Sequence, residues 1–104
     1  MITALVQFKL PAPITREQAC EMFSATAQKY RDIAGLIRKY YVLSQNGETA
    51  GGMYLWDSQK DAEQLYTAEW EQFIFDKYGT LPTVTYFDCP VLVDNVVGEI
   101  VIDK

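Results

Sequence analysis

The order of the hydrophobic patterns is the feature that most constrains the fold of this chain. Alternating apolar residues indicate strands, and apolar residues three or four positions apart indicate helices. These patterns follow one another as strand, helix, strand, strand, helix and strand, at residues 2–10, 16–32, 36–44, 50–56, 58–79 and 83–89. This order predicts an α+β domain with the ferredoxin-like βαββαβ topology, in which a four-stranded antiparallel sheet carries both helices on one face.

Local signals mark the ends of the two helices. Thr15 and Gln18 form a capping-box pattern before the first helix, and Ser58 with Asp61 can cap the second. The second helical pattern is open to a break near Thr67. The sequence therefore predicts a first helix over 16–32 and a second that is continuous or divided at Thr67.

The length of 104 residues fits one domain over residues 1–104, with 96–104 as a C-terminal extension. Within that extension, Val96–Ile102 is strongly apolar although it lies near a chain end, so an exposed coil is unfavourable. We expect this segment to form an added strand or arm against a dimer interface.

The dipeptide Asn46-Gly47 predicts a hairpin between the strands at 36–44 and 50–56, because a type I′ turn needs positive φ at both of its central positions. Placing these two residues at the centre of the turn fixes which residues lie opposite each other. The predicted partners are Lys39 with Tyr54, Tyr41 with Gly52, Leu43 with Ala50, and Ile37 with Trp56.

Both faces of this predicted hairpin are apolar or aromatic, although two helices can cover only one face of a four-stranded sheet. The uncovered face of a monomer is expected to be polar, so we predict a homodimer in which two sheets face each other. Aromatic rings mixed with polar tips are typical of a pocket lining. We therefore assign Lys39, Tyr41, Tyr54, Trp56 and, from the first strand, Gln7 to the cavity between the sheets, and Met53 and Leu55 to the face under the helices.

Charge and composition exclude several kinds of partner. The net charge is -5 with nine Lys and Arg, and these are not clustered, so neither nucleic acid nor a membrane surface is an expected partner. The first ten residues have no basic segment followed by a long apolar one, and we expect a cytoplasmic protein. Cys20 and Cys89 lie far apart outside any ligand spacing, which predicts reduced thiols.

The chain contains no histidine. Histidine is the commonest metal ligand, a common general base and the usual haem ligand, so catalytic triads, zinc sites and haem sites are not expected. We expect a protein without a metal ion and without a cofactor.

The segment Thr49–Trp56, read as TAGGMYLW, follows Gly35, Leu36 and Lys39 and precedes a capped helix. With Tyr86-Phe87-Asp88 near the end, it resembles a family of small bacterial proteins proposed to be monooxygenases, within the dimeric α/β-barrel superfamily. The resemblance covers nearly the whole chain in element order, and its most specific part is AGG followed by any residue, then Tyr, Leu and an aromatic residue.

The resemblance implies a dimer of ferredoxin-like subunits and cofactor-free oxygenation of a small aromatic compound. It places Trp56 at the strand end where related antibiotic-biosynthesis monooxygenases have an active-site tryptophan. Those relatives have an asparagine four residues earlier, where this chain has Gly52.

Cofactor-free oxygenation of a phenol or hydroquinone asks for an anion-stabilising donor and a dry cavity. Lys39 is the candidate donor or base, and its alternative role is to extend to the cavity rim or to pair with an acidic side chain. Tyr54 and Tyr41 can hydrogen-bond a substrate oxygen, and Trp56 can stack on its ring or donate its indole N–H. The remaining candidates are Gln7, which can orient a carbonyl, Gly52, and Asp88, a possible base or a strand-end carboxylate.

Two other functions remain open from the sequence. A protein of this fold can bind a small aromatic metabolite without turnover, or it can act as an isomerase or cyclase through proton transfer. Oxygen consumption distinguishes the oxygenase from both.

Overall fold

The computed structural model describes residues 1–104. Its elements, in chain order, are β1 (Ile2–Lys9), α1 (Arg16–Ala27), a 3₁₀ turn (Gln28–Tyr30), β2 (Leu36–Leu43), β3 (Thr49–Trp56), α2 (Gln59–Leu65), α3 (Ala68–Tyr78), β4 (Thr83–Asp88), β5 (Val91–Asp94) and β6 (Glu99–Ile102). No helix is long and apolar enough to cross a membrane.

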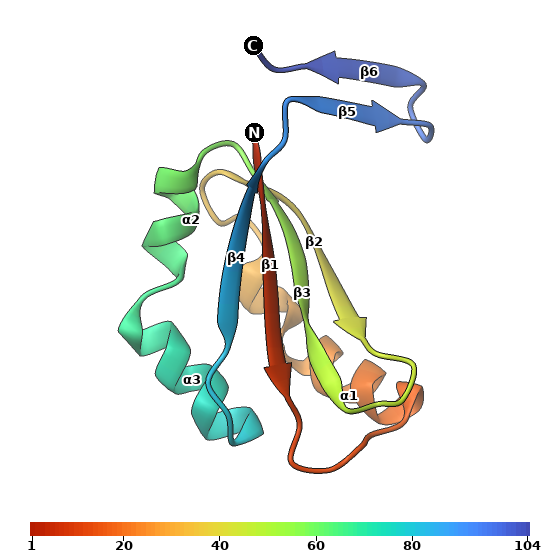
Figure 1. Ribbon diagram of the computed structural model, residues 1–104, viewed down its shortest axis with the longest axis vertical. Coiled ribbons are helices and arrows are strands. Elements are labelled where there is room, and N and C mark those ends of the chain that lie inside the picture. The colour runs from red at the N-terminus through yellow and green to blue at the C-terminus, as the bar shows by residue number, and fades with distance from the viewer.

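Strands β1 to β4 form one antiparallel sheet in the order β2-β3-β1-β4, and the helices lie on one of its faces (Figure 1). The two central strands, β3 and β1, therefore belong to segments that are far apart in the sequence. This arrangement is the predicted ferredoxin-like α+β fold.

The helix ends follow the predicted signals. Thr15 caps α1 through a complete capping box with Gln18, and the helix ends at Ala27, earlier than predicted, before the 3₁₀ turn. The second helical pattern is divided, because Thr67 accepts a hydrogen bond from the Trp70 N–H and starts α3. The divided form of the prediction is therefore the correct one.

The turn between β2 and β3 differs from the predicted type I′ turn. Gly47 has a positive φ of 74°, but Asn46 does not, and the connection is a four-residue loop closed by the Ser44–Thr49 pair. The Asn46 side chain accepts hydrogen bonds from the Ser44 hydroxyl and the Glu48 N–H, which stabilises this longer loop. The strand register does not change.

The observed register pairs Lys39 with Tyr54, Tyr41 with Gly52, and Leu43 with Ala50, as predicted. It departs from the prediction at the far end of β2, where an irregularity between Leu36 and Arg38 places Leu36 opposite Trp56. The predicted Ile37–Trp56 pair is therefore wrong. Ile37 is left exposed by the bulge.

The face assignment from the sequence is wrong, although the register is right. Lys39, Tyr41, Tyr54 and Trp56 lie under the helices, where Tyr54 and Trp56 join the core with Tyr30, Trp70 and Ile74. Met53 lies on the opposite, outer face and is 51% exposed. Gln7 pairs with Gly51 and therefore shares the outer face with Met53 and Leu55.

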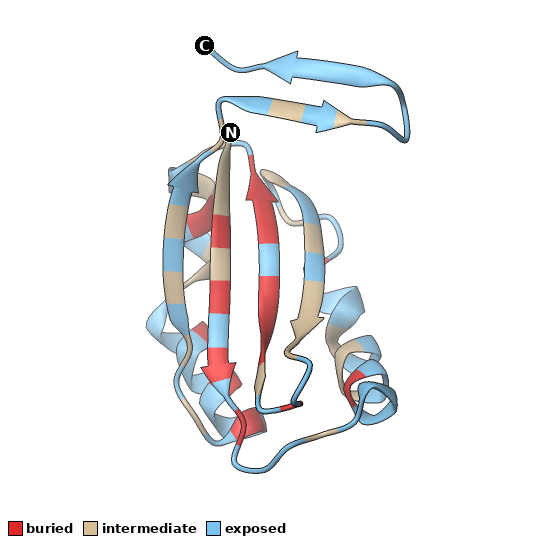
Figure 2. Cartoon of the chain, turned by 45° about the vertical axis from the view of Figure 1, so that its right-hand side comes forward, coloured by how far each residue is buried: buried red, intermediate tan, exposed pale blue.

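The C-terminal segment forms a hairpin of its own. Strands β5 and β6 pair only with each other and lie beyond one end of the main sheet (Figure 1). The predicted strand at the C-terminus is thus present, but it is not added to the main sheet. Every residue of β6 is exposed (Figure 2).

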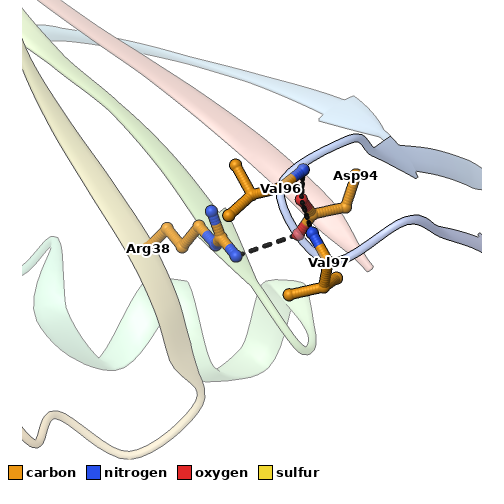
Figure 3. A network of polar contacts seen from close by, with 4 residues as sticks. All are labelled: Arg38, Asp94, Val96 and Val97. Carbon is orange, nitrogen blue, oxygen red and sulfur yellow. Dashed lines mark hydrogen bonds and ion pairs between the residues drawn. The ribbon is translucent and has the colours of Figure 1, made fainter.

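One ion pair holds this hairpin against the outer face. Arg38 of β2 donates to Asp94 Oδ2 at 3.0 Å, and Asp94 Oδ1 accepts the backbone N–H groups of Val96 and Val97 (Figure 3). Met1 also pairs through its amino terminus with Asp103. These contacts fix where the hairpin starts, while its apolar side chains stay uncovered.

Candidate functional site

A small cavity lies between the helices and the centre of the sheet, and we call it the Lys39 chamber. Its volume is about 20 Å³, and its walls come from β1, β2, β3, α1, the 3₁₀ turn and α3. The polar groups that reach it include Lys39, Tyr41, Tyr54, Tyr30 and Thr26. It is the one place where the predicted site residues of β2 and β3 meet.

Lys39 is surrounded by aromatic rings. Its Nζ atom lies 3.2 Å from the ring centroid of Tyr30, 3.7 Å from that of Tyr41 and 4.8 Å from that of Tyr54. No carboxylate pairs with it, because the two ion pairs of the chain are Met1–Asp103 and Arg38–Asp94. The amine is therefore held only by the faces of the three rings.

Gly52 makes room for this arrangement. A Cβ atom at position 52 would lie 2.8 Å from the Tyr54 ring and 3.2 Å from Lys39 Cε. Any larger residue would push against both side chains. The absence of a side chain at Gly52 thus lets the lysine stem and the tyrosine ring share the centre of the sheet.

The surroundings lower the pKa of Lys39. Burial disfavours the ammonium, and repulsion from Lys29 adds to this, so the pKa falls from 10.5 to about 6. The ring faces attract a cation and oppose the shift. Lys39 is thus a neutral amine at neutral pH that can still be protonated when a negative charge forms beside it.

The tyrosines around the amine behave in the opposite way. Burial, above all, raises the pKa of Tyr54, of Tyr30 and of Tyr41. Their hydroxyl groups therefore stay protonated and can serve as hydrogen-bond donors. A neutral amine and neutral phenols together can accept one proton and stabilise one anion.

Two hydrogen-bonded Trp–Tyr pairs support the chamber. Trp70 donates its indole N–H to Tyr30 Oη at 3.1 Å, and Trp56 donates its own to Tyr66 Oη at 3.1 Å. The Trp56 ring is fully buried and stacks at 6.2 Å and 8° against Tyr54. Trp56 therefore supports the position of Tyr54, and its N–H is already used inside the protein.

The structure brings together only part of the predicted site. Lys39, Tyr41, Gly52 and Tyr54 all line the chamber, but Trp56 lies behind Tyr54 and does not line it. Gln7 is on the outer face. Asp88 is exposed at the end of β4, opposite Ile2, and is away from the chamber.

Several residues of the site were not predicted. Tyr30 provides the ring nearest to Lys39 Nζ. Phe23 and Thr26 of α1 and Trp70 of α3 also line the chamber. The spacing of Phe23 and Tyr30, two turns apart on one helical face, is the signal that could have placed them over the sheet.

No group of three or more Cys, Asp or Glu side chains is placed to hold a metal ion. The side chains that line the chamber offer a lysine amine, phenol hydroxyls and aromatic walls.

Solved structures with the same fold include several monooxygenases. A Streptomyces coelicolor monooxygenase from the gene ActVA-Orf6, in complex with nanaomycin D, is 18% identical with a TM-score of 0.65, over 85% of this chain and 86% of that one. An antibiotic biosynthesis monooxygenase candidate from Deinococcus radiodurans is 14% identical with a TM-score of 0.64, over 90% and 97% of the two chains.

A third structure shares the fold without being described as a monooxygenase. It is an ethyl tert-butyl ether d (ethd) family protein from Bacillus halodurans, 19% identical with a TM-score of 0.56, over 86% and 99% of the two chains. At these identities the likeness concerns the fold alone. No curated protein matches the chain significantly.

The family is given by the sequence itself. Residues 4–84, which include most of β1, strands β2 and β3 and all the helices, match the model of the family described as "Putative mono-oxygenase ydhR". This match includes Lys39, Gly52, Tyr54 and every other wall of the chamber. The chain therefore belongs to the ydhR family.

Proposed function

We propose that this protein is a cofactor-independent monooxygenase that oxidises a small acidic aromatic compound, such as a phenol or hydroquinone, at the Lys39 chamber. The observation that carries the proposal is a lysine with a pKa of about 6 that lies among tyrosine rings without a carboxylate partner. Membership of a mono-oxygenase family supports the reaction class. The candidate site residues are Lys39 as base and Tyr54 as donor, with Tyr41 in the wall beside them.

The first step of the proposed reaction is a proton transfer. The neutral Lys39 amine accepts the proton of the substrate hydroxyl and leaves a phenolate beside an ammonium. The faces of Tyr30 and Tyr54 stabilise the ammonium, and the ammonium stabilises the phenolate. Exclusion of water from the chamber strengthens both interactions.

The phenolate then reduces O2 without a cofactor. A ring carbon forms a C–O bond with O2, and the resulting peroxide anion takes the proton from Lys39. Loss of the ring hydrogen as a proton breaks the O–O bond, which leaves a carbonyl on the ring and releases water. One phenol and one O2 give one quinone and one water, and the Lys39 amine is restored.

The Streptomyces coelicolor monooxygenase of the same fold was solved with the ligand nanaomycin D. This complex supports our proposal that the fold holds a ligand site. It also supports a small organic compound as the substrate of this chain. Trp56 acts in our proposal as a positioning residue, since it contacts Tyr54 and not the chamber.

We also propose that the working form is a homodimer joined through the outer face of the sheet. Tyr40, Met53 and Phe87 are large apolar side chains that lie exposed there, and they are more than half exposed. Contiguous exposed apolar surface of this kind favours an interface.

The cytoplasm is the compartment that we propose for this protein. Cys20 and Cys89 are free thiols. Unpaired cysteines suit a reducing compartment.

Oxygen uptake tests the proposed reaction. Wild type, Lys39→Met and the control Lys60→Met, at an exposed position of α2, are compared on a panel of phenols and hydroquinones. We expect wild-type kcat/KM to fall as the pH drops below about 6, because protonation removes the base. Lys39→Met should lower kcat/KM roughly 100- to 10,000-fold, and Lys60→Met should not.

The same panel tests a second candidate function. A neutral amine in a dry chamber also suits proton transfer without O2, which favours an isomerase or cyclase. Conversion of a compound without oxygen uptake would select that function. Tight binding of one compound with no conversion at all would select a non-enzymatic binding protein, and either result would refute the monooxygenase.

A further inference from the structure

A second, larger cavity lies beside the Lys39 chamber, and we call it the α1 groove. It has a volume of about 670 Å³ and runs between α1 and the end of β2 with its following loop. The two sides are tied together, because the Ile14 N–H donates to Gly47 O just before α1 begins. The groove opens to solvent past Arg16 and Cys20, both of which are exposed.

The chamber is too small for the substrate class that its chemistry suits. About 20 Å³ holds a molecule the size of water, whereas an aromatic ring needs several times that volume. A wall must therefore move before a ring can reach Lys39. Phe23 and Tyr41 line both the chamber and the α1 groove, so they form the wall between the two cavities.

We propose that the stacked Phe23–Tyr41 pair is a gate, and that a planar aromatic acid enters through the α1 groove and displaces this pair to reach Lys39. The identity of the ligand rests on the proposed function. The existence and place of the gate do not.

The gate is the weakest wall of the chamber. The two rings stack at 4.8 Å and 20°, and both side chains are only half-buried. The Thr26 hydroxyl donates to Phe23 O at 3.2 Å, so the 2.8 Å contact between Tyr41 Oη and Thr26 Oγ1 has the tyrosine as donor. The Tyr41 hydroxyl is thus held by a single neutral hydrogen bond.

The other walls are held more firmly. Tyr30 and Trp70 are 7% and 4% exposed and share a hydrogen bond, and Tyr54 is 3% exposed between Tyr30 and Trp56. Moving any of them would disrupt the core cluster to which they belong. The path of least cost to the amine therefore passes between Phe23 and Tyr41.

The charge in the groove favours an acidic ligand. Arg16 lines the groove and forms no ion pair, and no carboxylate side chain lines the groove. A carboxylate or phenolate on the entering compound can pair with this guanidinium. The same acidic compound then meets Lys39 at the inner end.

Chemical labelling of Lys39 tests the gate without any need for turnover. At neutral pH an aldehyde condenses with the neutral amine, water leaves, and cyanoborohydride delivers hydride to the imine to give a stable secondary amine. Formaldehyde is the small probe and 4-carboxybenzaldehyde the aromatic one. The labelling rate at Lys39 is measured by peptide mass spectrometry against the exposed Lys60 of the same sample.

Two variants should open the gate. Thr26→Val removes the hydroxyl that holds Tyr41, and we expect labelling by 4-carboxybenzaldehyde to rise roughly two- to tenfold while labelling by formaldehyde stays the same. Phe23→Ala removes one ring of the gate and should raise labelling by 4-carboxybenzaldehyde further. The matched control Thr85→Val is a threonine of β4 on the outer face without a side-chain hydrogen bond, and it should behave as wild type.

A further variant tests the ligand charge. Arg16→Gln should slow labelling by 4-carboxybenzaldehyde but not by 4-methylbenzaldehyde, and equal effects on both aldehydes would refute the acidic ligand. An aromatic labelling rate that changes in neither Thr26→Val nor Phe23→Ala would overturn the gate. Because labelling needs no oxygen, these outcomes are independent of whether oxygen uptake is found.

Discussion

Lys39 is costly to bury, and its position is therefore informative. Lysine is rarely withdrawn from water without a partner, and the half-buried Lys39 has three aromatic rings around it in place of a carboxylate. A salt bridge would have kept the amine protonated, whereas desolvation keeps it neutral. A neutral amine can take a proton from a phenol, which a permanently charged lysine cannot.

The cost of burying Lys39 should appear in the pH dependence of stability. The pKa is about 6 in the folded state and near 10.5 when unfolded, so between these values the unfolded chain binds more protons. Stability from this group therefore rises with pH across that window, by up to about 1.4 kcal/mol per pH unit.

Lys39→Met should remove this contribution while keeping most of the apolar stem. Urea unfolding of both proteins from pH 6.5 to 9 should show the unfolding free energy of wild type increasing relative to the variant as the pH rises. Curves that stay parallel over this range would mean that the folded-state pKa is ordinary. The pH range ends below the pH at which the tyrosines titrate, because their pKa values are raised by burial. Tyrosine titration therefore does not contribute to the difference between the two curves.

At the scale of the element, the hairpin of β2 and β3 shows what the sequence can predict. The register follows from Asn46-Gly47 even though the turn is a four-residue loop, because the Ser44–Thr49 closure keeps the same partners. The bulge before Arg38 had no signal of its own. Lys39 and Tyr54 were thus correctly predicted as neighbours from the sequence.

Which face of the hairpin meets the helices could not be decided by hydrophobicity, because both faces are apolar. The useful signal is size. The helix-covered face of the central strands has small residues at Ala4, Ala50 and Gly52, which leave room for the large rings of Tyr30 and Tyr54. Attention to this contrast would have placed the site beneath the helices and not between two sheets.

At the scale of the whole molecule, the helices leave the outer face of the sheet without cover, and the β5–β6 hairpin projects beyond it (Figure 2). An isolated two-stranded hairpin is marginally stable in water. A second copy of the chain packed on the outer face would cover the apolar residues of that face and of the β5–β6 hairpin together. The site under the helices would then stand apart from the dimer interface.

Two separate variants, each with a lysine in place of an exposed apolar residue, test the dimer. Met53→Lys places an ammonium in the middle of the outer face, and Phe75→Lys places one on α3, away from it. Met53→Lys should weaken dimerisation roughly tenfold or more, since an unpaired buried charge is strongly unfavourable, and Phe75→Lys should have no effect. Sedimentation of the wild type as a monomer at micromolar concentration would refute the interface.

The central claim of this account is that Lys39 is a neutral amine at neutral pH, and NMR titration of the lysine side chains tests it without a known substrate. The chain is labelled with ¹³C at lysine Cε, and the Lys39 signal is assigned by its loss in Lys39→Met. We predict that this signal titrates near pH 6. A Lys39 signal that titrates near 10, like that of a solvated lysine, would contradict the claim and with it the proposed base.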